Sequence, residues 1–397
     1  MALQAWEQRK LGEDSDVRDG THDSPKYFHT GHPLVTSKNL KDFGLDLSDI
    51  SFISNEDFES INKRSKVHVG DILFGMIGTI GNPVQLTRED FAIKNVALIK
   101  EKQNILNIFL IQLLKSAVFD RYIRNENTGG TQKFLSLSKI RDFHFFCPSL
   151  KEQNEISSFF KHLDNTIALH QRKLDALKQM KKGFLQQLFP ENGEKVPRVR
   201  FADFQEEWEQ RKLGDITDSF GYGLNASAKE YDGKSKYIRI TDIDESSHLF
   251  NQENLTSPDT CLDYANNYLL EEGDILFART GASTGKSYYY TKNDGRVYFA
   301  GFLIRARIKQ KYDVKFIFQN TLTSKYNNFI QITSQRSGQP GINALEYSKF
   351  ALCIPKLSEQ NKIGSFFQQL DKTIDLYHYR LDQLNILKKS CLQNMFI

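Results

Sequence analysis

The sequence predicts an α+β protein with two similar α/β units, which are separated by two long antiparallel coiled-coil helices. Two observations predict this fold. An internal duplication runs through the whole chain of 397 residues, and each copy ends in an apolar pattern with coiled-coil spacing. Together they give a pseudo-two-fold order of unit, helix, unit, helix.

Short motifs carry the duplication. The segments Trp6–Gly12, Gly70–Phe74 and Glu152–Asn154 each recur between 202 and 210 residues later. Between these motifs, residues 14–69 and 216–272 share little. Divergence on a common scaffold favours two sites of one kind that recognise different ligands, although neutral drift would give the same pattern.

Within each unit the sequence predicts short strands and one or two helices. Glycine and aspartate before Ile-Leu-Phe indicate a tight turn that leads into a buried strand. Alternating or helically spaced apolar residues predict the other elements. The predicted strands are 91–100 and 296–308, the helices 105–124 and 314–332, and the glycine-rich loops 129–133 and 337–341.

Two segments, Ile156–Leu188 and Ile363–Met395, carry the long helical pattern. Their core positions step by four and three residues in turn, which is the spacing of a coiled-coil seam. A capping box at Ser149 and Glu152 predicts the start of the first helix, and Pro190 predicts its end. Because domain termini are often close together, we expect the helices to pack antiparallel, as a rod of roughly 48 Å. The alternative is two amphipathic helices packed on separate cores.

One seam position is occupied by lysine in both helices, as Lys181 and Lys388. A polar residue in a seam fixes the register of the paired helices at some cost in stability. Alternatively, each long lysine side chain reaches out of the seam into water. The sequence is compatible with both interpretations.

Composition limits the class of protein. No run of eighteen apolar residues is present, so we expect no membrane span, and the N-terminus lacks a basic-then-apolar signal pattern. The four cysteines are scattered without a Cys-x-x-Cys pair, which argues against a zinc site or disulfide framework. We therefore expect a cytoplasmic protein in a reducing compartment. The net charge of +4 neither identifies nor excludes a nucleic-acid binder.

No catalytic constellation is visible among the motifs. The nine histidines have no metal-ligand spacing. Residues 281–287 resemble a phosphate loop, but three residues rather than four separate the glycines. A phosphate loop must also open a helix, whereas the strand-like run 288–291 follows here. The matching loop of the first unit, 78–83, has no lysine. These features argue against nucleotide binding.

What remains in each unit is a polar, glycine-rich loop beside positive charge. Arginine pairs with guanine edges and glutamine or asparagine with adenine edges, whereas lysine more often holds phosphates. For any single residue, an ordinary solvent-exposed loop is an equally good explanation. The interpretation as a DNA-binding loop rests on the presence of such a loop in both units. The candidate DNA-binding residues are Thr131, Gln132, Lys133, Arg279, Lys286, Gln335, Arg336, Gln339 and Asn343.

This set of features resembles the specificity subunit of a type I restriction–modification enzyme. The resemblance is carried by the duplicated Trp-Glu-Gln-Arg-Lys-Leu-Gly and Gly-Asp-Ile-Leu-Phe motifs, the loops 128–133 and 337–343, and the passage from proline through Glu-Gln-Asn into each heptad helix. It covers nearly the whole chain. The implied domains are a first target-recognition domain (1–150), a spacer helix (151–190), a linker (191–205), a second target-recognition domain (206–356) and a second spacer helix (357–397).

The resemblance implies that each recognition domain contacts one half of a bipartite target in double-stranded DNA. The helices would set the spacing between the halves and dock two methyltransferase subunits, through which restriction and translocase subunits join. A spacer of roughly 48 Å suits half-sites about one helical turn or somewhat more apart. The chain itself would be non-catalytic and hold no cofactor, because S-adenosylmethionine, ATP and Mg²⁺ would bind the partner subunits. No membrane contact is implied.

One departure from the pattern and two other classes of function stay open at this point. The second Trp-Glu-Gln is preceded by a lead-in segment, Val196–Phe204, that the first copy lacks, which leaves the edge of the first unit without that cover. A self-contained nuclease or methyltransferase would show turnover by the purified chain. A coiled-coil scaffold that binds only protein is the other class, and the polar loops argue against it.

Overall fold

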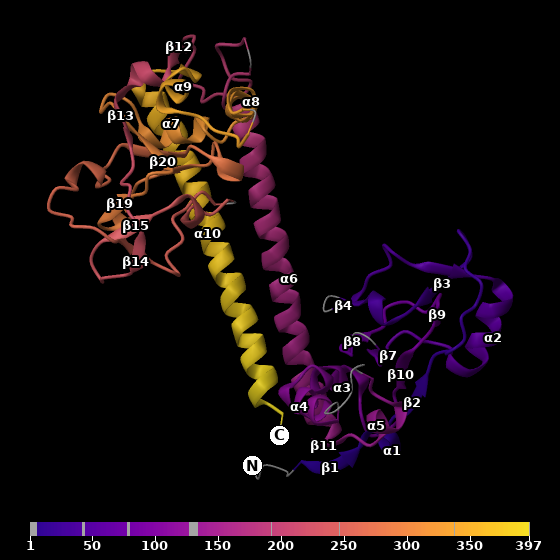
Figure 1. Ribbon diagram of the computed structural model, residues 1–397. Coiled ribbons are helices and arrows are strands. Elements are labelled where there is room, and N and C mark those ends of the chain that lie inside the picture. Colours follow the sequence, from indigo (N-terminus) through magenta and orange to yellow (C-terminus); the bar gives the residue numbers. More distant parts are fainter. Residues whose placement is uncertain are drawn as a thin grey trace. The chain divides into compact units, whose positions relative to one another are not determined.

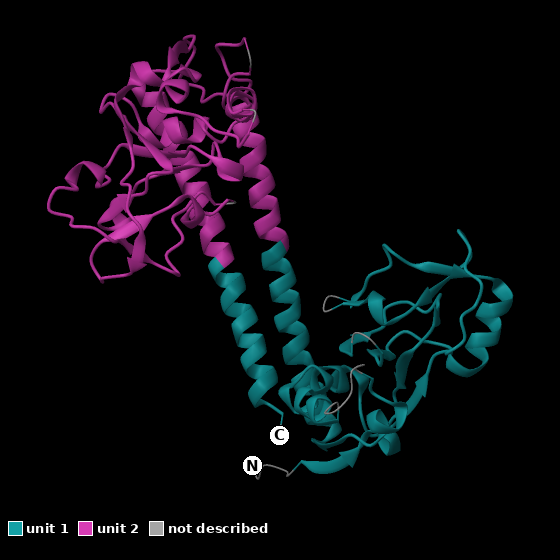
Figure 2. Cartoon of the chain, viewed as in Figure 1, with its two compact units in different colours: residues 1–171, 379–397 teal, residues 172–378 magenta. Residues whose placement is uncertain are grey.

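The computed structural model describes residues 6–41, 44–77, 80–126, 134–191, 193–245, 247–336 and 338–396. They form two compact units: unit 1 comprises residues 1–171 and 379–397, and unit 2 comprises residues 172–378 (Figure 2). No described helix is both long and apolar enough to cross a membrane. Each unit is an α+β body with the same plan, so the predicted fold class is confirmed.

Unit 1 is built around a four-stranded sheet and short helices (Figure 1). Its elements in chain order are β1 (Glu7–Lys10), α1 (Leu11–Asp14), β2 (Asp16–Asp19), β3 (His32–Val35), η1 (Ser37–Asn39), β4 (Leu40–Lys41), β5 (Gly44–Leu45), β6 (Ser51–Ile53), α2 (Asn55–Ser65), β7 (Ile72–Gly75), β8 (Gly81–Gln85), β9 (Ala92–Ile93), β10 (Val96–Lys100), α3 (Asn107–Leu114), α4 (Ala117–Glu126), α5 (Leu137–Arg141), β11 (His144–Cys147) and the first part of α6 (Leu150–Gln187).

Unit 2 begins within α6 and has a similar order of elements. Its elements are β12 (Glu209–Lys212), η2 (Leu213–Ile216), β13 (Thr217–Tyr222), β14 (Ala228–Glu230), β15 (Lys236–Ile238), η3 (Ile240–Asp242), β16 (Thr256–Pro258), η4 (Asn266–Tyr268), β17 (Asp274–Ala278), η5 (Gly281–Ser283), β18 (Ser287–Tyr289), η6 (Lys292–Asp294), β19 (Val297–Phe299), β20 (Leu303–Ile308), α7 (Val314–Asn320), α8 (Ser324–Thr333), α9 (Ala344–Ser348), β21 (Ala351–Ile354) and α10 (Leu357–Asn394). The last part of α10 belongs to unit 1.

The main sheets of the two units have the same topology. The strand order is β2-β10-β7-β8 in unit 1 and β13-β20-β17-β18 in unit 2, with every pair antiparallel. A two-stranded sheet, β1-β11 or β12-β21, joins the first strand of each unit to its last. The shared plan shows that the duplicated motifs mark duplicated structure.

Both faces of each main sheet are covered, which explains the continuous apolar motif Ile-Leu-Phe. In β7, Ile72 and Phe74 pack into one core with α3, whereas Leu73 packs into a second core on the opposite face. In β17, Phe277 packs into one core, whereas Leu276 packs into a second core on the opposite face. A strand buried on both faces needs apolar residues at every position rather than at alternate ones.

The glycine and aspartate of this motif build the turn before the strand. Gly70 and Gly273 have φ angles of +93° and +95°, a conformation that favours glycine. Asp71 accepts hydrogen bonds from His68 N at 2.8 Å and from Lys100 Nζ at 2.7 Å. Asp274 binds Arg307 of β20 through two hydrogen bonds. The predicted turn and buried strand are therefore confirmed, and the aspartates are structural.

The longer predicted elements are interrupted. Residues 105–124 form α3 and α4, and residues 314–332 form α7 and α8, rather than one helix each. The break before α8 arises because the Thr323 side chain accepts a hydrogen bond from Tyr326 N and so caps a new helix. The predicted strand 91–100 is likewise divided into β9 and β10, with Asn95 between them at a φ of +55°.

The helices α6 and α10 pack side by side and run antiparallel (Figure 1). Within unit 1, Lys388 Nζ lies 2.6 Å from Asp164 Oδ1; within unit 2, Lys181 Nζ lies 2.7 Å from Asp371 Oδ1. Each pair joins a lysine late in one helix to an aspartate early in the other, so the predicted antiparallel pairing is confirmed. Both seam lysines bind carboxylates, which favours a role in register over simple exposure to water.

An aromatic cluster lies where each helix pair meets its unit. In unit 1 it consists of Trp6, Phe109, Phe160 and Phe396, and the Phe396 ring centroid is 5.8 Å from that of Phe109 and 6.3 Å from that of Phe160. The cluster of unit 2 contains the repeat equivalents Trp208, Phe316, Phe367 and Phe189. Unit 1 therefore depends on the end of α10, and unit 2 depends on the end of α6.

We expect Phe396→Ala to destabilise unit 1 by about 3–5 kcal/mol, because it removes a ring that is 5% exposed from a packed cluster. The measurement is denaturant unfolding of the full chain, with amide hydrogen exchange to locate the loss. Phe159→Ala removes an exposed ring from α6 and is the matched control, with an expected change below about 1 kcal/mol. Equal loss of protection in both units would contradict this assignment.

Candidate functional site

Two loops of unit 2 that are distant in sequence meet at a hollow on its surface. Thr280 forms an isolated antiparallel bridge with Gly341, and Ile342 N donates a hydrogen bond to Arg279 O at 2.9 Å. Three of the sequence-predicted residues line this hollow: Arg279, Arg336 and Asn343. It has a volume of about 380 Å³ and is lined by Tyr222, Arg279, Thr280, Arg336, Gly341, Ile342, Asn343 and Glu346.

Arg279 is held by its main chain and by an aromatic ring. Its guanidinium carbon lies 5.1 Å from the ring centroid of Tyr222, a cation–π contact that contributes about 0.5–1 kcal/mol at an exposed site. Its backbone N donates to Phe302 O at 3.0 Å. The Tyr222 hydroxyl accepts a hydrogen bond from Ala344 N at 3.3 Å, which ties the ring to the start of α9. In the part of the chain that the structure describes, the Arg279 side chain has no hydrogen bond or ion pair.

The guanidinium donors of Arg336, by contrast, are already bound within the protein. Its Nη1 donates to the carbonyl oxygens of Thr333 and Gln335, and its Nη2 binds the Glu346 carboxylate. Asn343 Oδ1 accepts from Glu346 N at 2.9 Å, and Asn343 N donates to Glu346 Oε2 at 2.9 Å, a capping box that begins α9. Burial alone would raise the pKa of Glu346, but the bonds from Asn343 and Arg336 outweigh burial and lower that pKa. Arg336 and Asn343 thus shape the hollow.

The other predicted residues are not gathered at this hollow. Lys286 Nζ donates to Ile243 O at 3.1 Å, and Gln335 and Gln339 are exposed on the loop. Residues Thr131, Gln132 and Lys133 of unit 1 lie outside the described part of the chain and stay predictions. Sequence reasoning missed Tyr222; its only signal was an aromatic residue between two glycines, Gly221 and Gly223.

Unit 1 carries different side chains at the equivalent positions. Ala97 pairs with Asp19 where its repeat equivalent, Ile304, pairs with Tyr222, so Asp19 occupies the place of Tyr222. Met76 stands two residues after Phe74, as Arg279 stands after Phe277, and it is buried. These two neighbouring scaffold positions therefore hold a tyrosine and a stacked arginine in unit 2, and an aspartate and a buried methionine in unit 1.

Asp19 organises a small polar cluster in unit 1. It binds the Arg64 side chain, and its Oδ2 lies 2.8 Å from His22 Nε2. His22 Nδ1 lies 2.9 Å from Asn95 Oδ1. The hydrogen bond with Asn95, followed by the one with Asp19, raises the pKa of His22 above its ordinary value. The charged imidazolium is thus favoured in the folded chain.

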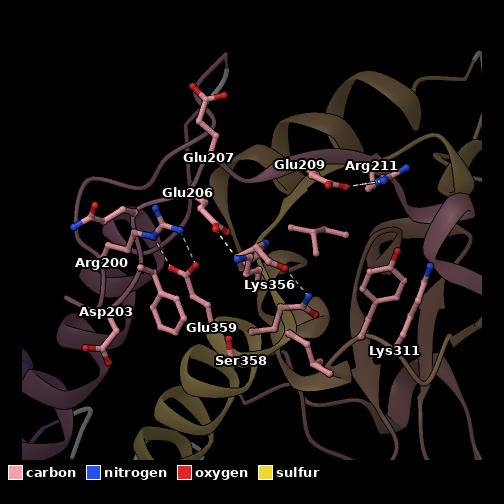
Figure 3. A pocket seen from close by; sticks show the side chains of 17 residues that line it. Arg200, Asp203, Glu206, Glu207, Glu209, Arg211, Lys311, Lys356, Ser358 and Glu359 are labelled. Carbon is pink, nitrogen blue, oxygen red and sulfur yellow. Dashed lines mark hydrogen bonds and ion pairs between the residues drawn. The ribbon is translucent and has the colours of Figure 1, made fainter.

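The lead-in segment before the second Trp-Glu-Gln packs on unit 2. Arg200 forms two hydrogen bonds with Glu359, at 2.7 and 2.8 Å, and their side chains are only 12% and 1% exposed. Figure 3 shows this pair at a cavity of about 730 Å³, where Lys356 and Glu206 form a further ion pair. The charged side chains that line this cavity thus mainly hold the lead-in segment in place.

At the corresponding edge of unit 1, a glutamate contacts the repeated tryptophan directly. The repeat equivalent of Glu359 is Glu152, whose Oε1 accepts a hydrogen bond from Trp6 Nε1 at 3.1 Å. Since Glu359 is already bound by Arg200, the buried Trp208 Nε1 has no partner among the described residues. The same glutamate position therefore anchors tryptophan in unit 1 and the lead-in segment in unit 2.

The glycine loop at 281–285 is not a phosphate loop. Its first residues form the short helix η5, and the chain then enters β18 rather than a helix whose N-terminus could face an anion. The strand that the sequence predicted after this loop is confirmed. Across the described ranges, no three His, Cys, Asp or Glu side chains gather so that they could hold a metal ion.

Comparison with known proteins identifies one family. The chain matches the family model described as "Type I restriction modification DNA specificity domain" twice, at residues 4–179 and 205–385. The type I restriction enzyme MjaVIII specificity subunit of Methanocaldococcus jannaschii is 19% identical over 377 residues, which cover 90% of this chain and 83% of that protein.

Two further relatives match over shorter stretches. The putative type I restriction enzyme MjaX specificity subunit of the same organism is 22% identical over 53% of this chain, and the match spans about half, 52%, of that relative's length. The type I restriction enzyme EcoBI specificity subunit of Escherichia coli is 32% identical over 32% of this chain and 27% of that protein.

The fold is also similar to that of solved structures. The S subunit of a type I restriction–modification system from M. genitalium gives a TM-score of 0.64 at 14% identity, and the match covers 99% of this chain and 96% of that one. A structure from a study of type I R-M complex assembly gives 0.59 at 14% identity, with 98% and 97% covered. At 14% identity, these matches show a similar fold and no more.

We expect Arg200→Ala to destabilise unit 2 by about 3–5 kcal/mol, because it leaves the Glu359 charge buried without a partner. Adding Glu359→Gln removes that charge and should recover much of the loss. The measurement is urea unfolding of the full chain with each variant. Arg198→Ala, which breaks only an exposed ion pair with Glu191, is the control and should cost less than about 1 kcal/mol. An equal loss with and without Glu359→Gln would contradict a buried-charge mechanism.

His22 should make the stability of unit 1 depend on pH. Because its pKa in the folded chain is raised above the ordinary 6.5, its contribution is fully present below that value and is lost as the pH rises through the folded pKa. NMR titration should place the His22 midpoint above 6.5, and Asp19→Asn should lower it. A midpoint at or below 6.5 in the unchanged chain would contradict the described hydrogen bonds.

Proposed function

Because the chain belongs to the family of the type I restriction modification DNA specificity domain, we propose that it is the DNA-recognition subunit of a type I restriction–modification complex. Each unit contacts one half of a bipartite target in double-stranded DNA. The observation that carries this proposal is the presence of two specificity domains, which together span most of the chain.

The chemistry of the two units supports recognition of two different half-sites. Their sheets share one topology, yet equivalent positions hold Tyr222 and Arg279 in unit 2 and Asp19 and Met76 in unit 1. A common scaffold with different polar groups at one place is what two unlike base sequences require. Base edges differ in their pattern of donors and acceptors, so the contacting side chains must differ as well.

The helices α6 and α10 set the spacing between half-sites in this proposal and dock the methyltransferase subunits. Exposed apolar side chains along them support a protein-binding role, since apolar groups left uncovered on a helix surface favour a partner. We expect two methyltransferase subunits, with restriction and translocase subunits joining through them. These exposed side chains are Phe159, Leu169, Met180, Leu376, Tyr379, Ile386 and Leu387.

Catalysis is assigned to the partners. The proposed subunit transfers no methyl group and cleaves no DNA, and S-adenosylmethionine, ATP and Mg²⁺ bind the methyltransferase and restriction subunits. The role of this chain is then to select the target adenines by binding the sequence around them. Its loss should abolish sequence-specific methylation while leaving the partner subunits intact.

Exchange of one recognition unit should change one half of the methylated sequence. We expect single-molecule sequencing of cells that carry this chain and its methyltransferase to reveal one bipartite adenine motif. Replacement of residues 1–150 by the corresponding segment of another specificity subunit should alter a single half of that motif. The half contacted by unit 2 should stay the same, because its sheet and loops are unchanged.

Deletion of the chain is the control, and the motif should then disappear. Methylation that persists without the chain, or a motif altered in both halves by the exchange, would contradict the proposal. Turnover on DNA by the purified chain alone, with S-adenosylmethionine and Mg²⁺ present, would instead indicate a self-contained enzyme.

A further inference from the structure

The hollow of unit 2 contains two guanidinium groups, one with its N–H donors bound and one with its donors unused. Arg336 directs its donors to Thr333 O, Gln335 O and the Glu346 carboxylate. Arg279 has five N–H donors and, among the residues described, no hydrogen bond or ion pair for its side chain. A buried or half-buried arginine normally has partners. The donors of Arg279 are therefore available to a ligand that enters the hollow.

The Arg279 side chain is also fixed in advance of binding. Its backbone is held on both sides, by Phe302 O and by Ile342 N, and its guanidinium lies over the Tyr222 ring. That ring is itself held by the hydrogen bond from Ala344 N to the Tyr222 hydroxyl. A long side chain that is ordered before binding loses less conformational entropy on contact, which favours both affinity and geometric selectivity.

The surroundings of Arg279 suit a base edge better than a phosphate. The Glu346 carboxylate and Arg336 line the same hollow as an ion pair, so their charges largely cancel and an incoming anion would meet only the single charge of Arg279. Next to the hollow, Phe302 and Leu345 are 60% and 69% exposed, and apolar side chains of this kind contact bases rather than the phosphate backbone. A planar guanidinium with two parallel free donors matches O6 and N7 of guanine.

We infer that Arg279 recognises a guanine in the half-site of unit 2 and that Tyr222 is the residue that positions it. This inference rests on the proposed function and adds the identity of the specificity-determining residue. Arg336 is a positioning residue as well, because it acts on the hollow through Glu346 and the start of α9. Unit 1 has Met76 and Asp19 at the equivalent positions, so this particular arginine–guanine contact is expected in unit 2 and not at the same place in unit 1.

The test uses the assembled complex, purified through a tag on this chain. A duplex library that keeps the first half-site and randomises the second is selected by binding and sequenced. With the unchanged chain, the second half-site should contain guanine on one strand at one or more positions. Arg279→Gln should reduce the preference at one of those positions by between about five-fold and about 150-fold. The first half-site and the other positions should be unaffected.

Four variants separate base recognition from other roles. Arg279→Lys keeps the charge but not the paired donors, so the preference should fall while overall affinity stays within a few-fold. Tyr222→Phe keeps the ring but loses the hydrogen bond from Ala344 N, so most of the preference should remain. Tyr222→Leu removes the stacking surface and should weaken the preference further. Arg211→Gln removes an exposed arginine that pairs with Glu209 on β12, and as the matched control it should leave the motif unchanged.

Two results would overturn the inference while the proposed function stands. One is a bipartite motif that Arg279→Gln leaves unchanged. The other is a uniform loss of affinity for all sequences in Arg279→Gln, with the salt dependence of binding reduced by about one phosphate contact and rescue by Arg279→Lys. A complex that selects no motif even with the unchanged chain would instead contradict the proposed function itself.

Discussion

Each unit depends on one phenylalanine supplied by the far end of a long helix. Phe189 follows α6, which begins in unit 1, yet its ring packs against Trp208 and Phe316 of unit 2. Phe396 follows α10 and packs against Trp6 and Phe109 of unit 1. Neither half of the duplicated sequence thus contains a complete core. Unit 1 closes only when the first and last described residues of the chain meet, a contact between distant residues that carries a large loop-closure cost.

The same arrangement fixes the helices relative to each unit's core. In each unit the aromatic cluster and a lysine–aspartate pair contact the helix pair at different points along its length. The ion pair is Lys388 with Asp164 in unit 1 and Lys181 with Asp371 in unit 2. A shift of one helix along the other would break both contacts together. The register of the pair is therefore set by packing and by charge at once, which suits the proposed role of the helices as a spacer.

A scaffold fixed in this way can carry loops of different chemistry. The aspartate of the repeated Gly-Asp-Ile-Leu-Phe motif builds the turn before the central strand in both units, as Asp71 and Asp274. Immediately after that strand the units diverge, and Arg279 in unit 2 replaces the buried Met76. In the proposed function, recognition chemistry begins where the shared structural motif ends, and substitutions there should alter specificity without disturbing the sheet.

The duplication, the order of units and helices and the antiparallel helix pair could all be predicted from the sequence, because repeated motifs and apolar spacing are local properties. The sequence also assigned Arg279 and Arg336 to two loops, which the structure brings together at one hollow. The packing of the folded chain, in contrast, leaves Arg336 bound by Glu346 and Arg279 stacked on Tyr222 with its donors unused. That difference depends on how β13, the loop after β17 and α9 pack together, and side-chain distances across a fold are not encoded in the spacing of residues along the chain.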